Sequence, residues 1–414
     1  MSHSPRGRTA LAGALLLVPL AMGTGGCGGS SNPLADKPYD ATGEVALTGG
    51  DGRKADPSKP LEVKATGADR ITDVTATDAA GRYVKGELAP DGSSWHSTGA
   101  LAAGAHYTVR VSTEDGEGAQ GRRTIGFDTS AADQLLRVAF GPQSGTYGVG
   151  QPVTAELSAP VEDPAARAVV ERALKVDSQP AVEGAWHWVD NRTLHYRPKD
   201  YWPAHATVEV RSGLDGIKVT GGLYGGPSKP VKLTTGDRIE AITDASAHSM
   251  TVLRNGQPIR SIPVTTGKPG YATRNGVKVV LGRESFVRMR GTSIGIAEGS
   301  DDSYDLPVYW ATRVTWSGEY VHAAPWSEGS QGAENVSHGC TGMSTANAKW
   351  FFDTVKLGDI VKVVGSAGAT MTPFDNGFGD WNMPWAKWRE GSALAAGKRD
   401  GSSPADAARL RPQL

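Results

Sequence analysis

The sequence predicts a mainly β protein built from several domains. Its 414 residues are more than one hydrophobic core usually covers. Short stretches of alternating apolar and polar residues recur along most of the chain, and 54 glycines and 25 prolines mark the turns between them. These observations predict two β-sandwiches, then a β-rich domain with one main helix, and finally a short Trp-rich C-terminal subdomain.

Residues 1–27 have the features of an export signal. Arg6 and Arg8 form a basic beginning, and the apolar run that follows, residues 9–22, is too short for a comfortable membrane span. The small residues before Cys27 resemble a bacterial lipobox, in which the cysteine becomes a lipidated N-terminus. We therefore expect an exported protein with Cys27 as a lipid anchor, and simple secretion is the alternative.

A tether and two sandwich domains are expected next. Residues 28–42 read as a tether whose first part is rich in Gly, Ser, Asn and Pro, which is typical of a flexible linker. Residues 43–133 and 134–236 each have about the length of one sandwich. Their clearest strand patterns lie at 60–65, 106–111, 135–140 and 207–210. Aromatic segments of the second domain look like those of a bacterial immunoglobulin-like domain: 186–188, 194–198 and 201–203. We expect both sandwiches to act mainly as a spacer.

A third β domain is predicted over residues 237–366. Asn255-Gly256 separates two alternating stretches, 249–254 and 257–262, a pattern typical of a tight hairpin. Ser344 or Thr345 is the expected cap of a helix that ends near Lys356, before a closing strand.

The C-terminal region divides into two parts. Residues 367–391 contain Trp381, Trp385 and Trp388, whose spacing predicts one apolar helical stripe used for packing. Residues 392–414 are rich in Ala, Gly, Ser and Arg and are expected to be disordered.

The candidate chemistry lies at Cys340, one of only two cysteines. A thiol becomes a strong nucleophile as the thiolate, so it needs a base or a positive environment. Cys340 precedes the capped helix, whose dipole and backbone amides would favour negative charge. His322 lies 18 positions upstream, at the end of an expected strand over 313–321. Taken alone, the cysteine also fits a small buried hydrophobe, whereas zinc is disfavoured because no second cysteine lies at ligand spacing.

The stretch Tyr320–Ser327, followed by Ser337-His338-Gly339-Cys340, resembles the signature of the L,D-transpeptidase family. That signature is a histidine, a spacer and then [S/T]-H-G-C. The wider pattern, which includes Trp310-Ala311-Thr312 and Gly379-Asp380-Trp381-Asn382, is similar to the multidomain actinobacterial lipoproteins of that family.

The resemblance implies a cysteine acyltransferase that acts on peptidoglycan stem peptides. Cys340 would attack a tetrapeptide donor, with His322 as general acid and base and a backbone carbonyl beside it to orient the imidazole. Ser337, His338 and Gly339 would shape the loop, and backbone amides of Gly339 and Cys340 would bind the oxyanion. A diamino-acid amine of another stem would then take the acyl group, which gives a 3→3 cross-link.

Other implications concern the pocket and the partners. The resemblance assigns substrate binding to Tyr304, Met289, Ser317, Gly318 and Gly342, although relatives usually carry Asn where Gly342 stands. Carbapenem β-lactams would acylate the cysteine. We expect no cofactor and no metal, and the net charge of −1 without a basic patch disfavours nucleic acid.

Two alternatives remain at this point. An L,D-carboxypeptidase would use the same thioester with water as the acceptor, and a non-catalytic wall-binding lipoprotein would use neither. A lipid on Cys27 would place the enzyme on the outer face of the cytoplasmic membrane, facing the cell wall.

Overall fold

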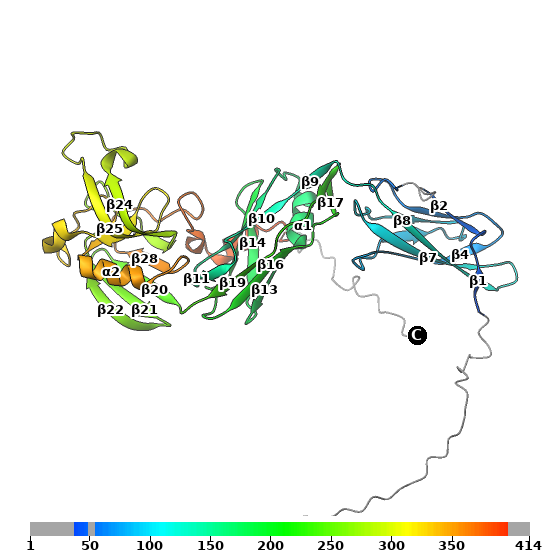
Figure 1. Ribbon diagram of the computed structural model, residues 1–414, viewed down its shortest axis with the longest axis horizontal. Helices are drawn as coiled ribbons and strands as arrows, with labels where there is room; N and C mark the ends of the chain where they lie inside the picture. The colour runs from blue at the N-terminus through cyan, green and yellow to red at the C-terminus, as the bar shows by residue number, and fades with distance from the viewer. Residues whose placement is uncertain (1–36, 49–53, 396–414) are drawn as a thin grey trace, which may run out of the picture.

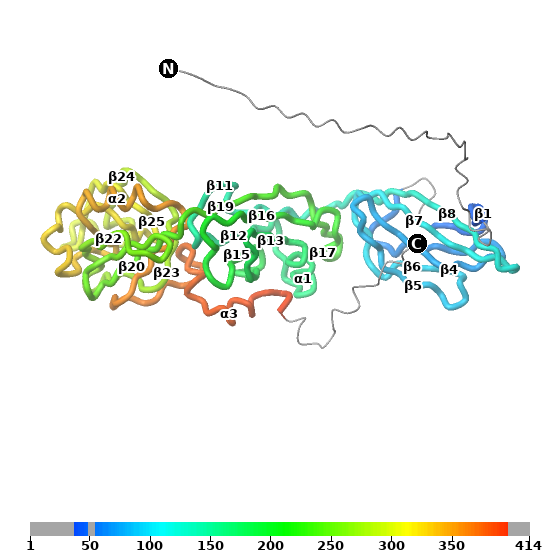
Figure 2. The backbone as a smooth tube through the Cα atoms, turned by 90° about the horizontal axis from the view of Figure 1, so that it is seen from below, coloured from blue at the N-terminus to red at the C-terminus, as the bar shows by residue number. Residues whose placement is uncertain are grey.

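The computed structural model describes residues 37–48 and 54–395 and arranges them as three β-rich domains in a row (Figures 1 and 2). The helices are few and short, which confirms the mainly β class. Within the described residues, no helix is both long and apolar enough to cross a membrane. The predicted export signal and Cys27 lie outside the described residues.

The first domain is a sandwich of two four-stranded sheets. Its apolar core contains Trp95 and a stacked pair, Tyr107 and Phe127, whose ring centroids are 5.3 Å apart. A short strand that falls within the predicted tether already pairs with this sandwich. One sheet has the order β1 (Tyr39–Asp40), β8 (Gln120–Asp128), β7 (His106–Glu114), β4 (Arg70–Asp78). The other has the order β2 (Val45–Thr48), β3 (Glu62–Ala65), β6 (Ser94–Ser97), β5 (Gly86–Leu88).

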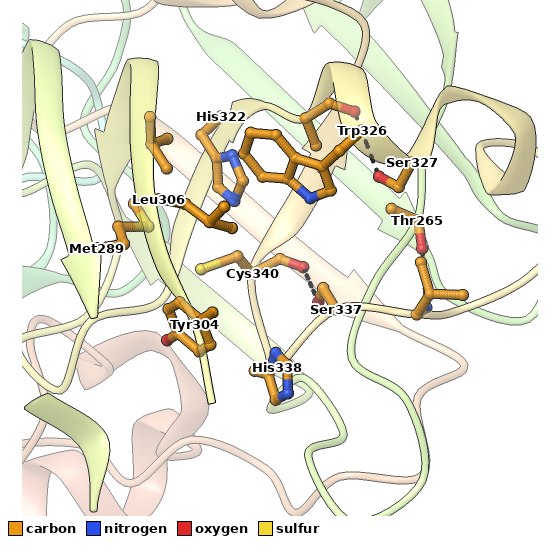
Figure 3. Close-up of a pocket in the computed structure, with 14 residues that line it drawn as sticks. Thr265, Met289, Tyr304, Leu306, His322, Trp326, Ser327, Ser337, His338 and Cys340 are labelled. Carbon is orange, nitrogen blue, oxygen red and sulfur yellow. Dashed lines mark hydrogen bonds between the residues drawn. The ribbon is translucent and has the colours of Figure 1, made fainter. Parts of the chain in front are cut away.

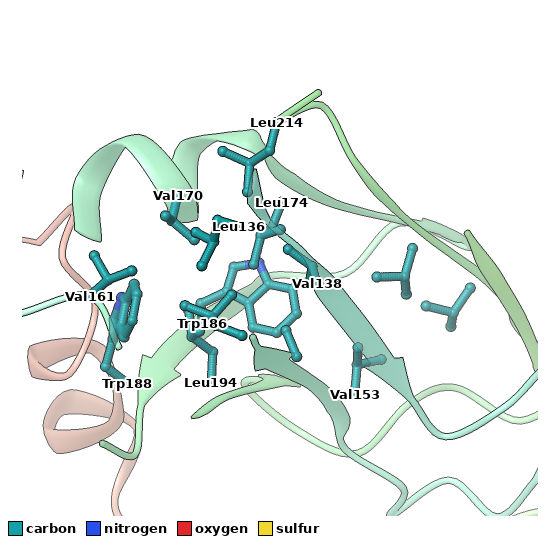
Figure 4. Close-up of a cluster of buried hydrophobic side chains, with 14 of the residues drawn as sticks. Leu136, Val138, Val153, Val161, Val170, Leu174, Trp186, Trp188, Leu194 and Leu214 are labelled. Carbon is teal, nitrogen blue, oxygen red and sulfur yellow. The ribbon is translucent and has the colours of Figure 1, made fainter. Parts of the chain in front are cut away.

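The second domain is also a sandwich, with a helix that the sequence analysis missed. Helix α1, Pro164–Ala173, begins where the Asp163 side chain accepts a hydrogen bond from Ala166 N at 2.7 Å. It covers the core around Trp186 and Leu194 (Figure 4). The expected strand over 135–140 is divided at Arg137.

Three sheets make up this second domain. The first has the order β10 (Val138–Gly141), β12 (Val153–Leu157), β15 (Thr193–Pro198), β14 (Gly184–Trp188). The second has the order β11 (Gly145–Tyr147), β19 (Val231–Thr235), β16 (Thr207–Ser212), β13 (Leu174–Gln179). A small sheet has the order β17 (Lys218–Thr220), β18 (Leu223–Gly225), β9 (Gln134–Leu136).

The third domain contains two sheets with helix α2, Thr345–Thr354, packed beside them (Figure 1). Ser344 is the N-cap of α2, as predicted. Asn255 and Gly256 have φ values of 51° and 82° and form the predicted hairpin turn. One sheet has the order β22 (Gln257–Pro263), β21 (Ser249–Arg254), β20 (Ile239–Asp244), β28 (Ile360–Val364), β23 (Gly276–Val279). The other has the order β24 (Gly282–Arg290), β25 (Asp305–Arg313), β26 (Tyr320–Ala323), β27 (Thr341–Met343). Short 3₁₀ helices η1 (Gly291–Ile294) and η2 (Pro325–Ser330) follow β24 and β26.

The Trp-rich segment does not form one helical stripe. Trp381 lies in a 3₁₀ helix, η3 (Asp380–Asn382), and α3 (Trp385–Glu390) starts only after Pro384. The three indoles still converge, because the buried Arg197 guanidinium lies 4.6–5.3 Å from all three ring centroids. The three tryptophans therefore have the predicted packing role, because they pack around the Arg197 guanidinium of the second sandwich.

The C-terminal segment joins the second sandwich to the third domain. Asn382 exchanges two side-chain hydrogen bonds with the backbone of Val277 on β23, at 2.7 and 2.9 Å. Farther along, α3 lies against the second sandwich (Figure 2). The first residues of the expected disordered tail, 392–395, also belong to the described structure, and Ala393 N donates to Glu171 at 2.7 Å.

Candidate active site

Cys340 lies in the loop that leads into β27. Its thiol donates to the Gly318 carbonyl at 3.6 Å, and the Tyr320 N–H donates to the sulfur. The expectation that Cys340 directly precedes a helix is wrong, because β27 separates it from α2. The groups next to the sulfur are therefore backbone atoms of the Gly318–Tyr320 segment.

His322 lies on β26, which pairs in parallel with β27 so that His322 is opposite Gly342. Its Nδ1 donates to the Ala323 carbonyl at 2.8 Å, which is the orienting contact that the resemblance implied. Because a carbonyl only accepts, this contact leaves Nε2 as the basic nitrogen. In Figure 3 the imidazole lies across from the Cys340 sulfur, at one wall of the same pocket.

The strand that carries His322 is shorter than expected. β25 ends at Arg313, and a turn separates it from β26 instead of one continuous strand over 313–321. Gly318 has a φ of 99°, a conformation that favours glycine, and Glu319 N donates to Thr315 Oγ1 at 2.8 Å. This turn brings the Gly318 carbonyl to the thiol.

Burial sets the charge state of the two candidate groups. It raises the pKa of the Cys340 thiol to about 12, although the Tyr320 N–H acts in the opposite direction. It also lowers the pKa of His322, which the Ala323 carbonyl partly counteracts. The resting pair is therefore a neutral thiol and a neutral imidazole, in which His322 can accept a proton as Cys340 reacts.

The neighbouring motif residues shape the loop. Ser337 Oγ donates to the Cys340 carbonyl at 2.6 Å and accepts from Gly339 N at 3.1 Å. The Gly339 amide, expected in the oxyanion hole, is therefore already bonded within the loop. The His338 ring lies between Tyr271 and Tyr304, at centroid distances of 4.7 and 5.0 Å.

Two cavities meet at Cys340 and share Tyr304 and His338. One, of about 270 Å³, is largely apolar and contains Met289, Gly342 and His322. The other, of about 520 Å³, is more polar and includes Ser317 and Gly318. All five residues that the resemblance assigns to substrate binding therefore line a cavity beside the thiol: Tyr304, Met289, Ser317, Gly318 and Gly342.

Gly342 lies where packing leaves no room for a side chain. A Cβ at this position would lie 2.9 Å from the Ala324 Cβ and 3.1 Å from Thr265 Cγ2. Gly342 N also donates to the Thr265 carbonyl at 2.8 Å. The glycine that replaces the usual Asn therefore stands at a position that Ala324 and Thr265 crowd from both sides.

Several lining residues were not identified from the sequence. Trp326 is half exposed at the cavity edge, and its ring centroid lies 6.0 Å from that of His322. Its place in the signature stretch was a usable signal. Arg274 and Glu319 line the polar cavity, and their contact depends on segments 45 residues apart, so no local pattern indicated it.

The described residues contain no group of three His, Cys, Asp or Glu side chains that could hold a metal ion.

Comparison with known proteins gives two family matches. Residues 52–218 match the bacterial Ig domain family, and residues 238–363 match the L,D-transpeptidase catalytic domain family. L,D-transpeptidase 2 of Mycobacterium tuberculosis is 36% identical over 404 residues, which cover 94% of this chain and 97% of that protein. L,D-transpeptidase 5 of the same species is 30% identical over 418 residues, which cover 95% and 88%. A solved structure of LD transpeptidase LdtMt1 in complex with imipenem is 38% identical, covers 56% of this chain and 100% of that one, and gives a TM-score of 0.49.

Proposed function

The chain belongs to the L,D-transpeptidase family and is an L,D-transpeptidase, and we propose that it forms 3→3 peptidoglycan cross-links through a thioester on Cys340. The observation that carries this proposal is the thiol at the junction of two cavities, with a carbonyl-oriented imidazole in one of them. Such a site has room for a donor on one side and an acceptor on the other.

Acylation starts from the neutral pair. As the Cys340 sulfur attacks the donor carbonyl, its proton passes to Nε2 of His322, and the Ala323 carbonyl stabilises the imidazolium through Nδ1. The tetrahedral intermediate then collapses with cleavage of the bond to the terminal D-Ala, whose amine takes the proton from His322. The product is an acyl-enzyme thioester and free D-Ala.

Oxyanion stabilisation falls mainly to the Cys340 amide. Within residues 37–48 and 54–395 its N–H has no hydrogen-bond partner, whereas the Gly339 N–H is bonded to Ser337 Oγ. A free amide beside the sulfur is suited to a developing negative charge on the donor oxygen.

Deacylation uses the same groups in reverse. His322 takes a proton from the acceptor amine as this amine attacks the thioester, and returns it to the leaving sulfur. The polar cavity suits the diamino acid, because Ser317 and the Arg274 side chain, which is 43% exposed, give it a polar wall. This second, polar cavity favours transfer over the L,D-carboxypeptidase alternative, since water would need no such space.

The enzyme acts on the cell wall and is therefore exported. We infer that Cys27 carries the lipid that holds it at the membrane. Cys27→Ala is expected to release the protein from the membrane fraction, and equal recovery of this variant and the wild type in membranes would exclude the anchor.

The test of the function is incubation with purified disaccharide-tetrapeptide, followed by mass analysis of the products. Wild-type protein is expected to give a cross-linked dimer with loss of D-Ala, and Cys340→Ala none. Accumulation of tripeptide alone would instead support the carboxypeptidase. A carbapenem is expected to add its mass to wild-type protein at Cys340.

Two histidine variants test whether His322 is the general base and His338 only supports the loop. His322→Ala is expected to lower the acylation rate by about 10²–10⁴-fold, the usual effect of losing a general acid–base group. His338→Ala removes a ring packed between two tyrosines and is expected to cost less. A larger loss in His338→Ala than in His322→Ala would reverse the assignment.

A further inference from the structure

A buried ion pair lies beside the nucleophile, and the acyl-transfer steps do not use it. Lys278, on β23, is 1% exposed, and its Nζ lies 2.5 Å from Oε2 of Glu319, which is 6% exposed. Arg274 adds a second cation, with Nη1 3.0 Å from Glu319 Oε1 and a main-chain N–H that donates to the same oxygen at 3.1 Å. Burying such charges is costly, and a cluster of three links the β23 strand to the loops around the site.

Glu319 lies between the two backbone groups that contact the Cys340 sulfur. The residue before it supplies the carbonyl that accepts from the thiol, and the residue after it supplies the N–H that donates to the sulfur. The Glu319 side chain also reaches the loop that precedes Cys340, since its Cγ lies 4.0 Å from where a Cβ on Gly339 would be. Movement of Glu319 would therefore displace both backbone contacts together.

The charges also act directly on the sulfur. The carboxylate of Glu319 raises the pKa of Cys340, and the ammonium of Lys278 lowers it. The other titratable groups that face this region are His322 and Tyr320 from β26, and Tyr271, Tyr304 and His338 from the loops. Lys278 and Arg274 therefore counteract a carboxylate that would otherwise oppose thiolate formation.

We propose that Lys278, Glu319 and Arg274 form a positioning cluster for the nucleophile. The Glu319 side chain anchors the turn whose backbone contacts Cys340, and the two cations neutralise the carboxylate charge at this place. The inference rests on Cys340 as the nucleophile of the proposed function, and none of the three residues bonds to the substrate carbonyl.

The test is the rate of iodoacetamide alkylation of Cys340 in the full chain, measured across pH. Lys278→Met leaves Glu319 charged, because Arg274 still pairs with it, and alkylation is expected to be about tenfold slower at each pH below the thiol pKa. Arg274→Gln is expected to slow alkylation in the same direction by a smaller factor. Glu319→Gln is expected not to slow it, and the double variant Lys278→Met/Glu319→Gln is expected to recover the wild-type rate.

The matched control is Lys349→Met and Asp353→Asn, which remove an exposed Lys–carboxylate pair on α2 in the same domain. Both are expected to alkylate at the wild-type rate. A structural role alone would give no rescue in the double variant, so absence of rescue overturns the proposal, as do wild-type rates in Lys278→Met and Arg274→Gln.

The proposal can still be tested if the Lys278→Met variant fails to fold. The Arg274 side chain is 43% exposed, so Arg274→Gln is safe for the fold and decides the matter if Lys278→Met does not fold. An unchanged rate in Arg274→Gln then overturns the proposal. Alkylation measures the reactivity of the thiol and does not depend on cross-linking. If the alkylation rates are as expected but no cross-link forms, the proposed function is refuted and the proposal for the positioning cluster still holds.

Discussion

Replacement of Trp388 is expected to weaken the connection between the second sandwich and the catalytic domain. The indole is fully buried, and its Nε1 donates to the Ala185 carbonyl of β14 at 2.9 Å. The Arg197 guanidinium lies 4.6 Å from its ring centroid, and His187 Nδ1 bonds to the Trp388 carbonyl at 2.8 Å. One side chain thus occupies a site formed by the neighbouring domain.

The cost follows from this burial. A buried Trp→Ala replacement typically lowers the free energy of unfolding by about 3–5 kcal/mol. For a unit of the size of the second sandwich and catalytic domain, this corresponds to a fall in Tm of roughly 6–20 °C. Thermal unfolding of the full chain measures the shift, and limited proteolysis near α3 reports whether the segment detaches.

Trp385→Ala is the matched control, because Trp385 lies on the same short helix but is only partly buried. Its indole donates to Glu183 at 3.3 Å and lies 5.3 Å from the Arg197 guanidinium, and its replacement is expected to cost less than that of Trp388, about 1 kcal/mol. Equal shifts in the two variants would refute the argument that the buried position of Trp388, rather than its aromatic ring as such, holds the domains together.

Three further predictions concern titration and packing. Burial raises the pKa of Asp359 to about 7, so between pH 3.8 and 7 the folded protein keeps a proton that the unfolded chain has lost. The free energy of unfolding is therefore expected to fall as pH rises through this window. Asp359→Asn is expected to flatten the pH dependence of Tm. Because the pKa of His322 is lowered, the rate of carbapenem acylation is expected to fall with acidification only below pH 6.5. A pH–rate profile whose acidic midpoint lies above pH 6.5 would contradict the assignment of His322 as the base. Gly342→Ala is expected to cost about 1–3 kcal/mol in urea unfolding, because the new methyl group would press on Ala324 and Thr265, and a neutral result would show that these neighbours give way freely.

Local signals in the sequence were sufficient for elements whose cause is local. Asn255-Gly256 determines a tight hairpin turn, and the Ser344 side chain caps α2 through a hydrogen bond from Asn347 N. Helix α1 had similar signals in Asp163 and Pro164, so its omission was a missed cap rather than a limit of the sequence. The family signature also led to residues that line the two cavities beside Cys340.

Long-range pairing explains what the sequence did not predict. β27 forms because it adds to β26 in parallel, and this pairing removes Cys340 from the helix N-terminus where local reasoning had placed it. In the same way, Trp388 packs on Ala185, about half the chain length away, which no periodicity within residues 381–388 could indicate. The C-terminal segment therefore packs the second sandwich against the catalytic domain, and the spacer role of the two sandwiches stays a prediction.

The neutral resting state of Cys340 has a consequence for an exported enzyme with a free thiol. Oxidants attack the thiolate in preference to the thiol, and the cell exterior is oxidising. With its pKa raised to about 12, Cys340 is expected to be almost entirely in the neutral thiol form at pH 7. The sulfur is then poorly reactive until a donor carbonyl lies against it and His322 takes the proton during attack. Burial therefore lowers the intrinsic reactivity of the nucleophile, while the adjacent base restores it only in the presence of the substrate.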